Sequence, residues 1–292
     1  MSQLDQFFTE CKNKIDEALL MKVDRQIEPR LKEAMIYSLQ AGGKRIRPLL
    51  LFATIKTLGG DLEQGLNTAL ALEMIHTYSL IHDDLPAMDN DDYRRGKLTN
   101  HKMYGDATAI LAGDALLTLA FTILSEDQTI SDAKKVALSK LISDSAGPLG
   151  MVSGQQADIL AEGKDLTLLE LQSIHHRKTG LLLFAAVTAG AIISDASKKE
   201  QQQLAIFADH IGVAFQICDD ILDVTGDEEK LGKKTGADSA LHKSTYPELL
   251  TLNGAQKALF KHYNQSIEAL SELGREAPLL TELASWIVKR DN

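Results

Sequence analysis

The sequence predicts an all-α protein built as a large helical bundle. Alternating β-branched segments and the hairpin signals between them are scarce, whereas helical periodicity is widespread. Only six prolines interrupt the 292 residues, and 44% of the residues are hydrophobic, which is enough for a large core. No linker, repeat or low-complexity tract is visible, so we expect a single domain over residues 1–292.

Nine segments show the periodicity of helices, and glycines or prolines lie near several of their ends. In chain order they are residues 31–40, 48–58, 66–84, 107–124, 131–143, 168–174, 181–193, 199–223 and 254–273. The sixth segment opens with a helix cap at Asp165 or Thr167. Residues 229–248 form the longest irregular segment, and a loop of that length is usually functional or disordered.

Residues 107–124 are long and mostly apolar, which raises the question of a membrane span. Asp114, Gly113 and three threonines interrupt the segment, and it lacks basic or aromatic flanks. A helix that is apolar on nearly all sides is typical of the centre of a large soluble protein. We therefore expect a central helix and no membrane span.

Charge and cysteine content narrow the classes of protein. A net charge of −10 and a pI of about 5.3 argue against non-specific binding to nucleic acid or anionic membranes. Small anionic substrates are still allowed, since they respond to local charge. Cys11 and Cys218 match no zinc or redox spacing, and the N-terminal residues lack the pattern of a signal peptide. We expect a cytoplasmic protein.

The stretch AFQICDDILDVTGD, residues 214–227, places four polar side chains on one face of a helix. Gln216, Asp219, Asp220 and Asp223 fall at i, i+3, i+4 and i+7 among apolar neighbours. Three carboxylates on such a face repel one another and are unfavourable to bury. Oxygen ligands gathered around Mg²⁺ would relieve that repulsion, so we expect a metal site rather than a solvated stripe or a set of arginine pairs.

The stretch SLIHDDLPAMDNDDYRRG, residues 79–96, is acidic in a different geometry. Asp83 and Asp84 continue a helix, but Asp89 follows Asp83 by six residues, about 240° round an ideal helix. A straight helix would turn Asp89 away from Asp83. Pro86 removes a backbone donor, so a bulge or a helix end there can bring Asp89 back. The glycine and closing glutamate of an EF-hand are absent at their offsets.

Basic residues accompany the two acidic motifs. They are Lys44, Arg45, Arg47, Arg94, Arg95, Arg177, Lys178, Lys233, Lys234 and Lys243. Together with the carboxylates they fit a polyphosphate held partly through Mg²⁺ and partly by Lys and Arg. The stretch GGKRIRP lacks the spacing of a Walker A loop and its Ser or Thr after Lys, which argues against an ordinary nucleotide site.

Four other polar residues have a structural interpretation. We expect Asp114 and Asp158 to cap helices or pair internally. His175 and His176 have no second ligand at metal spacing, so we interpret both as structural.

The motifs GGKRIRP, LIHDDLPAMDNDDYRRG, GDALL, GQQAD, KTG, FQICDDILD and GKKTGAD…KSTYP occur in this order. On these motifs the chain resembles the trans-isoprenyl diphosphate synthases of the bacterial type, from about Tyr37 to Pro247. The resemblance implies an all-α bundle around a central substrate cavity, the isoprenoid synthase fold, and a homodimer. It also implies Mg²⁺-dependent condensation of dimethylallyl or geranyl diphosphate with isopentenyl diphosphate to give farnesyl diphosphate.

The resemblance further implies roles for single residues. The metal ligands would be Asp83, Asp84, Asp89, Asp219, Asp220 and Asp223. The isopentenyl diphosphate would be held by Lys44, Arg47, His76 and Arg95. The allylic diphosphate would be held by Arg94, Lys178, Lys233 and Lys243, with Thr179 and Gln216 beside the reacting carbon. Arg45 and Lys234 are neighbours of these sets.

Charge accounts for the implied mechanism. Three Mg²⁺ ions, with a total charge of +6, would offset six carboxylates. As the allylic C–O bond breaks, preorganised cations stabilise the negative charge that grows on the leaving diphosphate. Thr179 and the Gln216 amide oxygen offer dipoles that do not trap the allylic cation. No His or Glu base stands out, and the resemblance implies that the departing pyrophosphate takes the proton.

Tyr78 is the candidate for setting product length. It lies five residues before Asp83, about 7.5 Å deeper along a helix. An aromatic side chain there can block a growing chain, and the resemblance associates an aromatic at this position with a farnesyl product. The alternative is that Tyr78 only packs in the core, as aromatics at helical spacing commonly do.

Three other functions stay open. A geranylgeranyl diphosphate synthase would differ only in product length. A terpene cyclase shares one aspartate-rich motif, but the second motif here, Asp-Asp-x-x-Asp, and the isopentenyl ligands disfavour it. A non-catalytic partner subunit of a prenyl synthase would be expected to have lost an aspartate motif, and this sequence keeps both.

Overall fold

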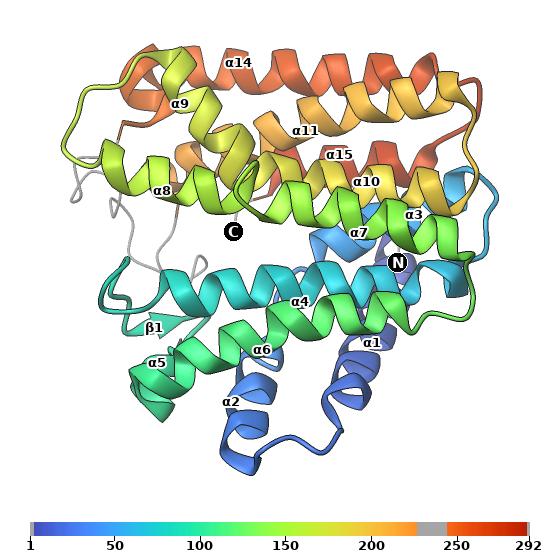
Figure 1. Cartoon of the computed structure of the whole chain (residues 1–292). Helices are drawn as coiled ribbons and strands as arrows, with labels where there is room; N and C mark the ends of the chain where they lie inside the picture. The colour runs from blue at the N-terminus through green and yellow to red at the C-terminus, as the bar shows by residue number, and fades with distance from the viewer. Residues whose placement is uncertain (1–2, 227–243, 291–292) are drawn as a thin grey trace.

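The computed structural model describes residues 3–226 and 244–290, and it confirms the all-α architecture (Figure 1). The helices are, in chain order, α1 (Gln3–Val23), α2 (Pro29–Leu39), α3 (Ile46–Thr57), α4 (Leu66–Asp83), α5 (Asn100–Tyr104), α6 (Asp106–Ser125), α7 (Asp132–Ala146), α8 (Met151–Ala161), α9 (Leu168–His175), α10 (Leu181–Ile193), α11 (Lys198–Thr225), α14 (Tyr246–Ser271) and α15 (Pro278–Lys289). A short 3-10 helix, η1 (Leu62–Gly65), precedes α4, and a π-helix, η2 (His176–Gly180), joins α9 to α10.

All nine predicted helices form, with shifted ends. Thr167, one of the two predicted caps, opens α9 in a capping box with Glu170, in which each side chain accepts from the other residue's backbone N–H. The largest shift is in α14, which begins at Tyr246. Thr251 bends this helix with a φ of +64°, and the predicted segment corresponds to the part after the bend.

Four helices, α1, α5, α8 and α15, lie outside the predicted segments. The helical signal of α8 is weak because Pro148 precedes it and Gly154 interrupts it. Residues 246–248, predicted to be irregular, begin α14 instead. Of the remaining irregular segment, residues 229–243 lie outside the described part of the chain.

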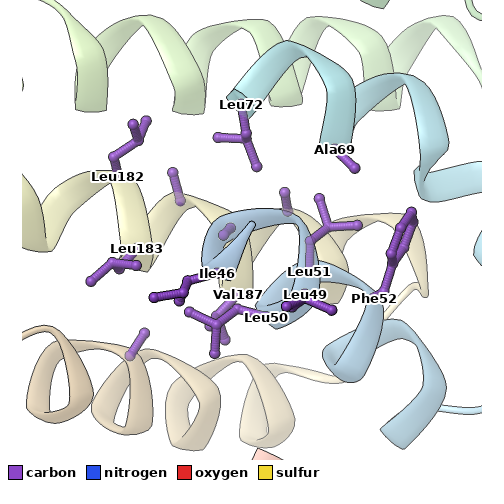
Figure 2. Packing of buried hydrophobic residues seen from close by; sticks show 14 of the residues in the cluster. Ile46, Leu49, Leu50, Leu51, Phe52, Ala69, Leu72, Leu182, Leu183 and Val187 are labelled. Atoms are coloured by element: carbon purple, nitrogen blue, oxygen red, sulfur yellow. The ribbon is translucent and has the colours of Figure 1, made fainter. Parts of the chain in front are cut away.

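The buried helix α3 organises the core. Its residues from Ile46 to Ile55 are all buried, and a helix that is apolar on nearly all sides is stable only where other helices surround it. Figure 2 shows its side chains packed against Leu72 of α4 and against Leu183 and Val187 of α10. Since α10 also packs on α11, this core fixes the relative positions of α4 and α11, the helices of the two acidic motifs.

The apolar helix α6 packs along α4, but it is not the central helix that its composition predicts. By length and composition it could cross a membrane, although core helices pass the same test and one such helix is weak evidence. Only 39% of its most apolar window is buried. Ile110 and Leu111 are 43% and 56% exposed. The described residues therefore leave an apolar face of α6 uncovered.

The stretch YRRG folds as a hairpin where the sequence signals predict none. Strand β1 (Tyr93–Arg94) pairs with β2 (Lys97–Leu98) in antiparallel register. Arg95 and Gly96 form the turn with φ values of +53° and +74°, the left-handed conformations of a two-residue hairpin turn. An arginine in this conformation is uncommon, so the turn is not visible in the sequence.

Arg45, a neighbour of the predicted basic sets, belongs to the core instead. Its guanidinium donates to Glu73 (2.6 Å), to Asp16 (2.9 Å) and to the carbonyl of Leu39 (2.7 Å). The side chains of Arg45 and Glu73 are both almost fully buried. A left-handed backbone at Arg45, just ahead of α3, directs the side chain towards α1 and α4.

Removing the anion of this buried pair should destabilise the fold. We expect Glu73→Ala to lower the free energy of unfolding by about 3–5 kcal/mol, because it leaves a buried guanidinium partly uncompensated. Urea denaturation followed by circular dichroism measures the loss. The matched control is Glu63→Ala, which removes the partner of Lys14 in an exposed pair and should cost less than about 1 kcal/mol. Equal losses in the two variants would contradict the assignment.

Candidate active site

The first acidic motif lies where α4 ends. The helix stops at Asp83, Asp84 caps it, and Pro86 follows. The amide of Asp89 then donates to the carbonyl oxygen of Asp83 (2.9 Å). Of the two predicted possibilities, a bulge or a helix end, the structure has the helix end. The chain doubles back and returns Asp89 to the end of α4.

Asp83 and Asp84 lie in surroundings that disfavour charge. Burial, together with the neighbouring carboxylates Asp89 and Asp84, raises the pKa of Asp83 to about 6, although Lys178 acts in the opposite direction. Burial also raises the pKa of Asp84, and Arg94 opposes that rise. The Nε of Arg94 donates to Oδ1 of Asp84 (2.6 Å), and the Nη2 of Arg94 forms an ion pair with the same oxygen (2.5 Å). Arg94, which is predicted to bind the allylic diphosphate, thus neutralises the charge of Asp84, which is predicted to bind the metal.

The second acidic motif lies on α11 as predicted, with its four polar side chains on one face of a regular helix. Asp220 and Asp223 are buried, whereas Asp219 is half-buried. The Gln216 amide donates to Asp219 (3.3 Å), and Asp220 accepts from the backbone N–H of Tyr246 (2.9 Å). The motif therefore contacts the start of α14 as well as its own helix.

Arg290 is a residue of this site that the sequence reasoning misses. Its guanidinium donates to Asp219 (2.6 Å) and to the carbonyl of Phe215 (3.0 Å), and it lies 3.9 Å from the centre of the Phe215 ring. It follows α15 and is almost fully buried. The only signal for it in the sequence is the basic stretch WIVKRDN.

Both glycines of AGGKRIRP contact Arg95: Gly42 through its carbonyl oxygen, and Gly43 through the space that its missing side chain leaves. The Arg95 guanidinium donates to the carbonyl oxygen of Gly42. A Cβ atom on Gly43 would lie 2.6 Å from Nη1 of Arg95, so no larger residue fits there without displacing the arginine. Lys44 lies 5.7 Å from the centre of the Trp286 ring of α15. Arg95 and Lys44, two of the residues predicted to bind isopentenyl diphosphate, thus connect the hairpin, the segment before α3 and α15.

A cavity of about 330 Å³ brings predicted residues from separate segments together. They are Arg47, His76, Tyr78, Asp83, Lys178 and Thr179. Another wall is formed by α8, with Met151, Val152 and Ile159. Charged and apolar side chains thus line the same space, which fits a ligand with a charged head and an apolar tail.

A neighbouring cavity of about 160 Å³ holds residues of the second motif. Gln216, Asp219 and Asp220 line it together with Lys178, which also lines the larger cavity. Lys178 donates to Asp158 of α8 (2.7 Å), which confirms the internal pairing expected of Asp158. The lysine therefore lies between the two acidic motifs.

Lys178 and Thr179 are presented by η2, a π-helical turn. Such turns are rare and are frequent at functional sites. Gly154 of the GQQAD motif permits this placement, because a Cβ atom on it would lie 2.6 Å from the Cα of Lys178. Gln155, the next residue, lines the larger cavity, and within the described chain neither of its amide atoms has a hydrogen bond partner. Gln155 is a further candidate to which the sequence reasoning gives no role.

The cations differ in how firmly they hold their protons. Burial lowers the pKa of Arg47 to about 10, so it stays charged at pH 7. Burial, followed by the charges of Arg47 and Arg95, lowers the pKa of His76 well below its ordinary value. Neutral His76 can therefore donate one hydrogen bond to a phosphate oxygen but cannot supply a positive charge.

Some predicted residues lie elsewhere. Asp84, Arg94 and Arg95 line a separate small cavity rather than the two larger ones. His175 stacks on Tyr246 with ring centres 5.9 Å apart, in keeping with the structural role predicted for it. Lys233, Lys234 and Lys243 lie outside the described residues.

Within residues 3–226 and 244–290, no three His, Cys, Asp or Glu side chains gather closely enough to hold a metal ion by themselves. Mg²⁺ is nevertheless commonly bound through one or two carboxylates, with water and phosphate oxygens completing its shell. Asp83 lines the larger cavity and Asp219 and Asp220 line the smaller one, and one or two carboxylates at each place fit that mode of binding.

Comparison with known proteins identifies the family. The polyprenyl synthetase family model matches residues 28–277. A farnesyl diphosphate synthase from Geobacillus stearothermophilus is 50% identical over the full length of both chains, and a geranylgeranyl diphosphate synthase from Cyanophora paradoxa is 43% identical, covering 98% of this chain and 96% of its own. A geranyltransferase structure from Helicobacter pylori, complexed with magnesium and isoprenyl diphosphate, aligns with a TM-score of 0.85 at 34% identity, covering 99% of this chain and 97% of its own. The chain belongs to the polyprenyl synthetase family.

Proposed function

We propose that the protein is a trans-prenyltransferase that condenses dimethylallyl and geranyl diphosphate with isopentenyl diphosphate to give farnesyl diphosphate. The observation that carries this proposal is the cavity that joins Asp83, Arg47 and Lys178 to an apolar wall containing Tyr78. The 50% identity to a farnesyl diphosphate synthase supports the same reaction, and a geranylgeranyl product is the less supported alternative.

The isopentenyl diphosphate is held by Lys44, Arg47, His76 and Arg95. Arg47 supplies a permanent charge, and neutral His76 supplies a hydrogen bond donor. Arg95 is fixed by Gly42, so its planar guanidinium is oriented before the substrate arrives. The allylic diphosphate is held by Arg94 and Lys178, and also by Lys233 and Lys243, which lie outside the described residues.

Mg²⁺ fits the donor set that the chain offers. The carboxylates of both motifs would hold it, at Asp83, Asp84 and Asp89 and at Asp219, Asp220 and Asp223, and we propose three ions per site. Burial, and then the neighbouring carboxylates, raise the pKa of Asp83 in spite of Lys178 and Arg94, so a bound cation would stabilise its ionised form, which supports a role as a metal ligand. When bound, Mg²⁺ stabilises the negative charge that develops on the leaving diphosphate.

The reaction proceeds by ionisation, condensation and elimination. The allylic C–O bond breaks with its electron pair going to the diphosphate oxygen, where Lys178 and Arg94 stabilise the charge. The π electrons of isopentenyl diphosphate then form the new C–C bond to the allylic carbon. Thr179 and Gln216 present oxygen dipoles to the cation without a strong nucleophile.

Condensation leaves a cation on the methyl-bearing carbon of the isopentenyl unit, and a proton must finally leave the neighbouring CH2 group to form the new double bond. His76 is a poor acceptor because its burial, and then the charges of Arg47 and Arg95, disfavour a positive charge on its ring. We infer that an oxygen of the released diphosphate takes the proton, since that group is already held beside the reacting carbons.

The chain is proposed to work as one domain and as a homodimer. The exposed apolar face of α6, with Ile110 and Leu111, supports this proposal, because a second copy of the chain could cover it and uncovered apolar patches often mark interfaces. Cys11 and Cys218 are both buried and free, which supports the proposal of a cytoplasmic, reducing location.

The function is tested by product analysis. Dimethylallyl and isopentenyl diphosphates with Mg²⁺ should give a C15 diphosphate by mass spectrometry. Asp219→Asn should lower turnover by at least about 10²-fold, because it removes a charge that stabilises the reacting complex. Asp209→Asn, an exposed carboxylate earlier on α11, is the matched control and should keep full activity. No C15 product would refute the farnesyl assignment, a cyclic hydrocarbon would favour a cyclase, and no condensation would favour a partner subunit.

The charge on Asp83 should weaken the fold of the metal-free protein. Its pKa in the folded state, about 6, lies above the ordinary value of 3.8, so the ionised form destabilises the folded state above pH 6. We expect Asp83→Asn to raise the free energy of unfolding at pH 7.5. The gain should shrink as pH falls through 6 and vanish below about 4, where the carboxyl is protonated in both states. Glu268→Gln, at an exposed position, should show no such pH dependence in urea titrations. A gain that does not change with pH would argue against the charge as its cause.

The proposed dimer contact can be broken at α6. Leu111→Glu places a charge on the exposed apolar face, so we expect the variant to sediment as a monomer where the wild type sediments as a dimer. Val136→Glu, which changes a 70% exposed residue of α7, is the control and should remain a dimer. Monomeric wild type would count against the homodimer.

A further inference from the structure

The imidazole of His82 lies beside Tyr78 in the substrate cavity. Both residues are on α4, one turn apart, and both line the cavity of about 330 Å³. Their rings meet edge to face, with centres 5.7 Å apart and planes at 77°. His82 keeps 27% of its side-chain surface exposed. Tyr78 is therefore not a solitary aromatic, because a second ring supports it on the side of Asp83.

The His82 ring is anchored on α6. Its Nε2 lies 3.0 Å from the carbonyl oxygen of Ile110 and 3.9 Å from the carboxylate of Asp114. A carbonyl oxygen can only accept, so Nε2 carries the proton and donates to it. The contact fixes the orientation of the imidazole relative to α6, and through the edge-to-face contact it limits the rotation of Tyr78.

Gly113 of α6 determines how closely the ring approaches. A Cβ atom on Gly113 would lie 2.5 Å from Cδ2 and 2.9 Å from Cε1 of His82, and closer still to Nε2. Real side chains do not approach so closely, so the imidazole occupies the volume that any larger residue would need. Glycine is a poor residue for a helix interior, and this close approach is a packing reason for its presence in α6.

We propose that His82 is a specificity-determining residue that forms one stop with Tyr78, and that Gly113 sets the depth of this stop by seating His82 against α6. The inference rests on the proposed prenyl transfer, in which the growing chain extends along α4 away from Asp83. The product length then depends on the position of two rings rather than on the bulk of Tyr78 alone.

Two substitutions should shift the product in opposite directions. Gly113→Ala places a methyl group where His82 lies, so the imidazole has to move off α6 and into the cavity, which shortens the space for the chain. His82→Ala removes the ring and its support of Tyr78, which lengthens that space. We expect Gly113→Ala to raise the C10 to C15 ratio, and His82→Ala to raise the C20 to C15 ratio, each by about tenfold. Tyr78→Ala should act in the same direction as His82→Ala.

The experiment measures product ratios by mass spectrometry at equal conversion from dimethylallyl and isopentenyl diphosphates with Mg²⁺. His82→Phe keeps a ring against Tyr78 and should keep C15 as the main product. The double variant Gly113→Ala/His82→Ala should give the long products of His82→Ala, because the methyl group then has no imidazole to displace. This double variant also relieves the crowding, so it tests the proposal even where Gly113→Ala folds poorly.

Gly190→Ala is the matched control for packing damage. It crowds Thr54 of α3 from α10, with a Cβ 2.7 Å from Cβ of Thr54, and neither residue lines the cavity. Its product ratios should equal those of the wild type. Unchanged ratios in both His82→Ala and the double variant, with condensation retained, would overturn the proposal. A wild type that forms no condensation product would instead refute the proposed function.

Discussion

The crowding of carboxylates at the ends of α4 and α11 is the constraint on which the rest of the site depends. These groups are partly withdrawn from water, and the pKa of Asp83 reflects the unfavourable energy of ionising it there. Cations from distant parts of the chain offset this charge. They are Arg94 of the hairpin, Lys178 of η2 and Arg290, which follows α15. Under the proposed function, Mg²⁺ would compete with these cations for the same carboxylates, and the diphosphates would compete with the carboxylates for the cations.

Two neighbouring arginines, Arg45 and Arg47, have different roles on the basic side of the site. Arg45 pairs with buried Glu73 and ties α1, α4 and the start of α3 together, whereas Arg47 lines the substrate cavity. The left-handed backbone of Arg45 separates the two roles within three residues. Glu73 also opposes the loss of charge on Arg47 that burial would cause. The core and the proposed diphosphate site thus share one electrostatic network.

Helical periodicity was sufficient to predict the bundle and the face shared by Gln216, Asp219, Asp220 and Asp223, since spacing alone decides which side chains of a regular helix lie together. The position of Asp89 was open, because a proline permits either a bulge or a helix end, and only the bond from its amide to Asp83 decides between them. Arg290 could not be predicted, because it meets Asp219 across 71 residues of sequence. The sequence also does not predict the orientation of Arg45 or the hairpin turn at Arg95. Both depend on a left-handed backbone conformation that arginine rarely adopts.

That hairpin has a consequence for how the sequence can change. Arg94 reaches Asp84 at the end of α4, while the adjacent Arg95 reaches Gly42 ahead of α3. Two consecutive residues of a hairpin cannot move independently, so this hairpin ties the end of α4 to the segment ahead of α3, and under the proposed function it links the two diphosphate sites. An insertion or a proline in this turn would damage both sites at once. Under the proposed function, a substitution here that alters the binding of one substrate would therefore also alter the binding of the other.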